Sequence, residues 1–175
     1  MSPFRWKHRR LVTDLEPHEA ALLRQVVTEV HRVLSGDADQ PTGAAGRGER
    51  MDPVTERLLP DGHRGDPKLA EDYRTLTEDG IRQEKLADAD LLLDTVSEDG
   101  GRIELDLNAA EAWLRTINDV RLTFGVLLGV QESDDPLIQA EETGDQRWGA
   151  YSWLTAVQGL LVDALASRTR RPSAG

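Results

Sequence analysis

The sequence predicts a mainly α-helical protein with at most a small β-sheet near its N-terminus. Apolar residues recur at helical spacing over long segments. Strict alternation of apolar and polar residues is confined to short stretches. Asp-Pro pairs, at Asp52–Pro53 and Asp66–Pro67, each place a favoured N-cap before a residue suited to the first helical position. We expect about six helices in one domain, residues 1–166, with a flexible insert at residues 35–50 and a disordered tail at residues 167–175.

The segment from Asn108 to Val130 is the longest strongly patterned apolar stretch, and we expect it to form the central helix. Asn108 is the expected N-cap, with Glu111 in the capping-box position, and Gly129 should mark the C-terminal end. Gly125 costs about 1 kcal/mol in a helix interior, which suggests the close approach of a neighbouring helix. The predicted buried stripe consists of Leu114, Ile117, Phe124 and Leu128, with Trp113 and Val120 beside it.

The remaining helices are placed by apolar spacing and by their capping residues. Thr77 is predicted to restart a helix after a break, since the residues on either side suit a hydrophobic staple. The acidic segment Gln131–Asp145 is expected to be a loop. The expected helices are Glu16–Leu34, Pro53–Leu59, Pro67–Leu76, Thr77–Val96 and Trp148–Ala166, of which the first and last should flank the central helix.

Two stretches indicate β-structure. Residues Phe4 to Leu15 are expected to form a short hairpin, and Arg102 to Leu107 a strand that pairs with Leu11–Val12, because a lone strand is unstable. The basic tract Arg5–Arg10 lies within the hairpin. It has two interpretations: a solvated edge whose cations balance the acidic body, which we favour, or an arm that contacts nucleic-acid phosphates.

Composition excludes several classes of function. The net charge is −11, so phosphate binding by the whole surface is disfavoured. The absence of cysteine excludes disulfides, thiolate metal sites and cysteine nucleophiles. The scattered histidines offer no metal-ligand spacing and no catalytic triad, so we expect no metal, no cofactor and no enzyme activity. No apolar run approaches the roughly 20 residues of a membrane span, so we expect a soluble cytoplasmic protein.

Three segments together resemble a known family. They are DPVTERLLPDGHRGDPKLAEDYRTLTEDGIRQEK (Asp52–Lys85), AWLRTINDVRLTFGVLLGV (Ala112–Val130) and YSWLTAVQGLLVDAL (Tyr151–Leu165). Their order and spacing resemble the actinobacterial domain-of-unknown-function family twenty-seventeen. The resemblance implies a small, mainly helical regulator of transcription in the oxidative-stress response, acting with an alternative sigma factor. Thiol-based redox sensing, which has been suggested within that family, is impossible in a chain without cysteine.

Charged and polar residues within these segments suggest a polar cluster. Asn118 and Arg121 lie inside the predicted apolar stripe and should be buried with it. An unpaired buried guanidinium would cost several kcal/mol, so we predict a carboxylate partner for Arg121. The candidate residues are Arg57, Asp66, Arg74, Lys85, Asn118, Asp119 and Arg121. The cluster has two interpretations: an ion network that fixes the packing of the helices, which we favour, or a ligand site for an anion.

The function that the resemblance and the charge favour is regulation through protein–protein contact, with a sigma factor or RNA polymerase as the partner. One alternative is a structural or adaptor protein linked to proteolysis, since genes of the resembled family often lie near genes for a protease adaptor and a metalloprotease. Another is a direct DNA binder, which would need a basic recognition helix that none of the expected helices provides. An enzyme would need paired carboxylates or a nucleophile with a base, and no spacing singles these out.

Overall fold

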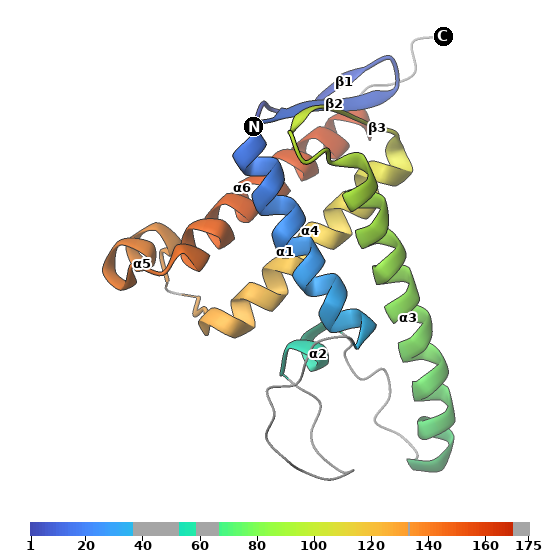
Figure 1. The fold of residues 1–175 in the computed structure, drawn as a ribbon. Coiled ribbons are helices and arrows are strands. Elements are labelled where there is room, and N and C mark those ends of the chain that lie inside the picture. Colours follow the sequence, from blue (N-terminus) through green and yellow to red (C-terminus); the bar gives the residue numbers. More distant parts are fainter. Residues whose placement is uncertain (37–52, 59–66, 133, 170–175) are drawn as a thin grey trace.

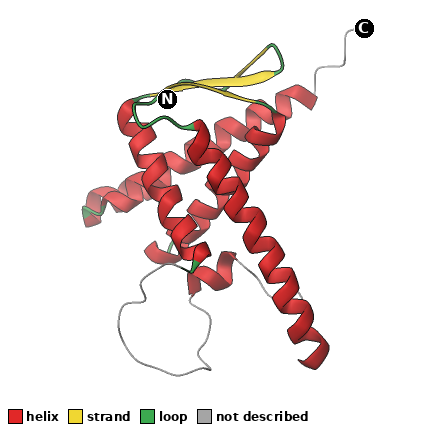
Figure 2. Cartoon of the chain, turned by 45° about the vertical axis from the view of Figure 1, so that its right-hand side comes forward, coloured by secondary structure: helices red, strands yellow, loops and turns green. Residues whose placement is uncertain are grey.

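A computed structural model describes residues 1–36, 53–58, 67–132 and 134–169, and helices dominate it (Figures 1 and 2). The helices are α1 (Pro17–Ser35), α2 (Pro53–Leu58), α3 (Pro67–Thr95), α4 (Leu107–Leu128), α5 (Pro136–Thr143) and α6 (Gln146–Thr169). The prediction of a mainly helical fold with a small sheet is confirmed. Residues 37–50 of the predicted insert and residues 170–175 of the predicted tail lie outside the described residues.

The sheet confirms the predicted hairpin and the predicted third strand. Its strands are β1 (Arg5–Lys7), β2 (Arg10–Leu15) and β3 (Gly101–Leu105), antiparallel in the order β1-β2-β3. Leu11 and Val12 pair with Leu105 and Glu104, which lie within the strand that was predicted to pair with them. The hairpin turns through His8 and Arg9, whose φ angles of 47° and 68° are both positive. Glycine and asparagine adopt this geometry most readily, so the turn lacks the usual sequence signature.

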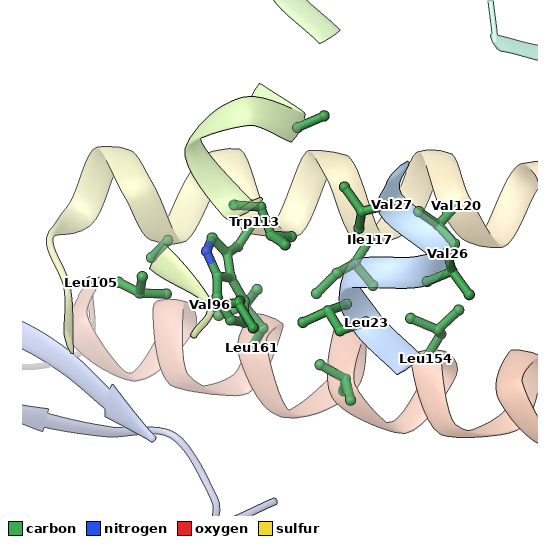
Figure 3. Packing of buried hydrophobic residues seen from close by; sticks show 14 of the residues in the cluster. Leu23, Val26, Val27, Val96, Leu105, Trp113, Ile117, Val120, Leu154 and Leu161 are labelled. Carbon is green, nitrogen blue, oxygen red and sulfur yellow. The ribbon is translucent and has the colours of Figure 1, made fainter. Parts of the chain in front are cut away.

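Helix α4 is the centre of the fold, as predicted. It contacts α1, α2, α3 and α6, and its first turns lie against β2 and β3. Trp113, Ile117 and Val120 are fully buried, and they meet apolar residues of α1, α6 and the end of α3 (Figure 3). The indole Nε1 of Trp113 donates to Thr95 Oγ1 at 2.8 Å, which satisfies its one buried polar group.

The predicted details of α4 need two corrections. Leu114, Phe124 and Leu128 are only half-buried, because the buried face is rotated toward Thr116, Asp119 and Thr123. The N-cap is Asp106 rather than Asn108, and its carboxylate accepts a hydrogen bond from the Ala109 amide at 2.9 Å. Gly129 ends the helix in the left-handed conformation, as predicted.

Three helices, α3, α5 and α6, also differ from the prediction. Helix α3 runs unbroken through Thr77, because a threonine inside a helix costs only a few tenths of a kcal/mol and no proline interrupts the hydrogen bonds there. Helix α5 occupies part of the expected acidic loop. It begins with a third Asp-Pro pair, in which Asp135 is the N-cap and Pro136 lies in the first turn. The Asp135 carboxylate accepts a hydrogen bond from the Leu137 amide at 2.9 Å. Helix α6 continues to Thr169, beyond the predicted end at Ala166.

Helices α1 and α3 are antiparallel and satisfy each other's C-terminal carbonyl groups. Arg24 of α1 donates to the carbonyl oxygens of Leu93 and Val96, at 2.7 and 2.6 Å, at the end of α3. Arg82 of α3 donates to the carbonyl oxygen of Leu34, at 2.9 Å, at the end of α1. The last carbonyls of a helix have no partner within the helix, and the negative end of the helix dipole favours a cation there.

Replacing Arg24 should therefore destabilise the fold more than replacing a surface arginine of the same helix. We expect Arg24→Met to lower the free energy of unfolding by about 1–3 kcal/mol, the scale of hydrogen bonds to a charged group. Arg32→Met is the matched control, since its ion pair with Glu29 is about half exposed and such pairs contribute about 0–1 kcal/mol. Urea denaturation measures both. Equal losses for the two variants would contradict the capping role.

Candidate functional site

The candidate residues divide between two faces of α4. Lys85 and Asp119 meet at the α3–α4 contact, whereas Asn118 and Arg121 face α6. Arg57 of α2 lies at a cleft that Arg121 also lines. Asp66 and the side chain of Arg74 lie outside the described residues. The separation follows from helical geometry, because consecutive residues such as Asn118 and Asp119 point about 100° apart around the helix axis.

The α3–α4 contact holds a ladder of four charges, which we call the α3–α4 ladder: Lys85, Asp88, Arg115 and Asp119. Lys85 Nζ contacts both carboxylate oxygens of Asp119, at 2.6 and 2.7 Å. Arg115 forms a two-pronged pair with Asp88, with Nε–Oδ2 at 2.6 Å and Nη2–Oδ1 at 2.8 Å. Asp88 and Arg115 were not among the residues predicted from the sequence. Their spacing was the available signal, because each lies three or four residues from a predicted member, on the same side of its helix.

Burial sets the electrostatics of the α3–α4 ladder. Asp119 is 5% exposed, and its burial raises the pKa of its carboxyl group above the ordinary value. Asp88 raises that pKa as well, while the hydrogen bonds from Lys85 and the charge of Arg115 lower it. Burial is the largest of these effects, and the cations offset it only in part, since the pKa of Asp119 remains raised. Such an arrangement suits a structural role, in which α3 is held in one register against α4.

Arg121 is held by a different set of partners on the face toward α6. Its Nε donates to Thr155 Oγ1 at 2.9 Å, and its Nη1 donates to Gln158 Oε1. Gln158 Nε2 donates in turn to Asn118 Oδ1 at 3.2 Å. The guanidinium carbon lies 5.3 Å from the centroid of the Tyr151 ring, at cation–π distance.

The predicted carboxylate partner of Arg121 is wrong for the part of the chain that the structure describes. Its polar contacts there are a hydroxyl and an amide, and the nearby carboxylate of Asp119 pairs with Lys85 instead. The predicted burial is also wrong, since Arg121 and Asn118 are half-buried. A guanidinium that keeps part of its hydration does not need an opposite charge, and this explains why neutral partners suffice.

A cleft of about 320 Å³ opens beside Arg121, between α2, the C-terminal half of α4, and α6. Its lining consists of Arg57, Arg121, Leu122, Gly125, Val126, Val130 and Tyr151. The predicted close approach at Gly125 is wrong, because a Cβ atom added there would meet nothing within 4 Å. The glycine instead leaves open space at the cleft.

No group of three or more histidine, aspartate or glutamate side chains among the described residues is arranged to hold a metal ion. No helix in the described ranges is both long enough and apolar enough to cross a membrane.

The family model described as "Domain of unknown function (DUF2017)" matches residues 1–165. The chain belongs to this family. Proteins named oxidative stress regulator AosR, from Mycobacterium tuberculosis and Mycobacterium bovis, are each 33% identical over 187 residues, which cover 90% of this chain and 86% of theirs. A relative from Mycobacterium leprae is 34% identical over 179 residues, covering 89% of this chain and 82% of its own. No solved structure shows a significant match.

The α3–α4 ladder generates a prediction about pH. We expect Lys85→Met to destabilise the protein by up to about 3 kcal/mol at pH 7, at the low end for breaking a buried pair because Lys85 is 21% exposed. The folded state already raises the pKa of Asp119, and losing Lys85 raises it further. A raised carboxyl pKa means that the folded state gains stability as the pH falls, because it binds the proton before the unfolded state does.

The unfolding free energy that Lys85→Met loses relative to the unmodified protein should therefore become smaller as the pH falls toward 3.8, the ordinary pKa of an aspartate carboxyl group. We call this loss the deficit of the variant. Urea denaturation at pH 7 and pH 5 measures it. The control is Arg102→Met, which breaks an ion pair whose side chains are 49% and 51% exposed and should cost under about 1 kcal/mol at either pH. A deficit that is the same at both pH values would show that Asp119 does not carry the effect.

Proposed function

We propose that this chain is a regulator of the oxidative-stress response that acts by contact with a protein partner, namely an alternative sigma factor. The observation that carries the proposal is its similarity to proteins named oxidative stress regulator, which extends over 90% of the chain at 33% identity. This role needs no catalytic centre. It also cannot use a thiol of this chain as the sensor, because the sequence has no cysteine.

The distribution of charge favours a protein partner over DNA. The described helices carry mixed charges, and none presents the run of lysine and arginine residues that a recognition helix brings to the major groove. Exposed cations are closest together in sequence in the hairpin, at Arg5, Lys7, Arg9 and Arg10, and the other exposed arginines of the described residues are spread over several elements. So few phosphate contacts on a protein of net charge −11 would give only weak, salt-sensitive DNA binding.

Helix α5 has the features of a contact surface. None of its residues is buried, and it lies at one side of the fold, away from the sheet (Figure 1). Leu137 and Ile138 are 63% and 51% exposed, beside the exposed carboxylates Glu141 and Glu142. Exposed apolar side chains can anchor a partner, while acidic side chains speed association with a basic surface. We therefore propose that α5 meets a basic, partly apolar face of the sigma factor.

The DNA part of the proposal is tested with purified components. We expect the protein alone to show no sequence-dependent binding to a stress promoter at about 0.15 M salt, because it can neutralise few phosphates. With the sigma factor and RNA polymerase present, it should join the promoter complex. Band-shift titrations with promoter DNA and a scrambled duplex measure both. Tight binding of the promoter by the protein alone would replace this proposal with a direct DNA binder.

The contact surface is tested with variants of α5. Leu137→Ser/Ile138→Ser should weaken sigma-factor binding by about tenfold or more, since each anchor contributes on the order of 1 kcal/mol or more when it becomes buried. Val162→Ser is the matched control, because this apolar residue of α6 is 45% exposed. Calorimetric titration gives the affinities, and melting curves check the folding of each variant. Equal affinities for the two variants would exclude α5 as the contact surface.

A further inference from the structure

We propose that the cleft between α2, α4 and α6 binds a small organic acid that has an apolar body. In this site, Arg57 and Arg121 take the carboxylate, and the aliphatic side chains of the lining take the apolar body. The proposal goes beyond the regulatory function above and does not depend on it. It rests on the state of Arg121, on the balance of charge in the cleft, and on Gly125.

Arg121 is oriented before any ligand arrives. A guanidinium group has five N–H donors, of which Thr155 and Gln158 each accept one. The Tyr151 ring lies 5.3 Å from the guanidinium carbon and packs against it. No partner within the described ranges accepts the remaining donors, and the residue lines the cleft. A guanidinium whose orientation is fixed loses little freedom when a carboxylate binds to it, and it can offer two parallel hydrogen bonds.

The cleft is cationic on a strongly acidic protein. The chain has 32 acidic and 21 basic residues, yet both charged residues in the described lining are arginines. Elsewhere on α4 the comparable cation, Arg115, has a carboxylate directly against it. Two guanidinium groups at one cleft repel each other, and an anion between them would remove that repulsion.

Gly125 supplies the second part of the site. It lies in the last turn of α4, where glycine is unfavourable by up to about 1 kcal/mol relative to alanine. Its backbone φ does not require glycine, and no neighbouring atom lies within 4 Å of the position of a Cβ atom. Neither backbone geometry nor packing explains the glycine. What it does provide is space at the cleft, next to the aliphatic side chains of Leu122, Val126 and Val130.

The volume sets the size of the ligand. A cleft of about 320 Å³ is at the lower end for small-molecule sites. At roughly 30 Å³ per water-sized group, it has room for about ten non-hydrogen atoms. An aromatic or medium-chain aliphatic acid fits this volume and the mixed lining, whereas an inorganic anion would leave the apolar part empty.

Benzoate is the probe for the test, with benzamide as its neutral counterpart and inorganic phosphate as a purely polar anion. Amide NMR spectra of the full chain give the affinities. We expect benzoate to bind with a dissociation constant on the order of 1 mM, as suits so small a ligand. Benzamide and phosphate should each bind about tenfold more weakly or worse, because one lacks the charge and the other lacks the apolar body. Shifted amide signals should map to the cleft.

Two variants and one control complete the test. Arg121→Gln should weaken benzoate binding by about tenfold, the scale of one charged hydrogen bond. Gly125→Leu should fill the cleft and abolish binding without lowering the melting temperature, since the added side chain meets open space and leucine favours a helix. The control is Gly159→Leu on α6, where a Cβ atom also meets nothing within 4 Å and which is not among the lining residues, so benzoate should bind as before.

Three results would overturn the proposal. The first is no shift of cleft signals at about 10 mM benzoate, tenfold above the expected dissociation constant. The second is unchanged benzoate binding to Gly125→Leu. The third is phosphate binding as tight as that of benzoate, which would reduce the cleft to a simple anion site. Because Gly125→Leu is expected to stay fully folded, these outcomes are independent of any loss of stability in Arg121→Gln.

Discussion

The buried face of α4 is the constraint on which the other helices depend. Trp113, Ile117 and Val120 are completely enclosed, and the residues that enclose them come from α1, the end of α3, and α6 (Figure 3). A face this apolar can be covered only if those three helices meet around it, because burying such side chains contributes roughly 1.5–3 kcal/mol each. The hairpin adds to the cover at one end, where Phe4 meets Trp113 edge-to-face at 6.4 Å. Trp6 of β1 ties the hairpin to α6, because its indole Nε1 donates to the Ala164 carbonyl oxygen at 2.8 Å.

Beside its apolar face, α4 has one polar edge toward α3 and another toward α6. The burial of the side chains on each edge explains which partners they need. On the α3 side, Asp119 is almost fully enclosed, so its charge needs Lys85 directly against it. On the α6 side, Arg121 is half-buried and keeps access to solvent, so a hydroxyl and an amide are enough to hold it. One helix therefore carries an enclosed charge pair on one side and, on another side, an arginine that lines a cleft. The difference lies in burial rather than in residue type.

The sequence was most informative where a local rule acts alone. Alternation of apolar and polar residues predicted the strand β3, which pairs with Leu11 and Val12 as expected, and apolar spacing identified α4 as the central helix. It was less informative where a side chain can pair with residues of more than one segment. Asp119 lies only two positions from Arg121 in the sequence, yet its carboxylate pairs with Lys85 of α3. The sequence does not reveal which cation it pairs with, because the pairing depends on how α3 is rotated against α4. The break expected at Thr77 did not occur because a capping pattern inside a long helix is not sufficient to end it. Helix α5 was overlooked although Asp135–Pro136 carries the same signal as the Asp-Pro pairs that had been identified.

The cleft and α5 are physically connected through the start of α6. Tyr151 lines the cleft and lies in the second turn of α6. Helix α6 begins at Gln146, and only Asp145 separates it from the left-handed Gly144 that ends α5. Helix α5 also packs against α6. A ligand in the cleft therefore touches the element that positions the proposed contact surface. Proximity alone does not make the two sites interact. The ligand changes partner binding only if it has different affinities for two arrangements of α6, and the partner then changes the affinity for the ligand by the same factor.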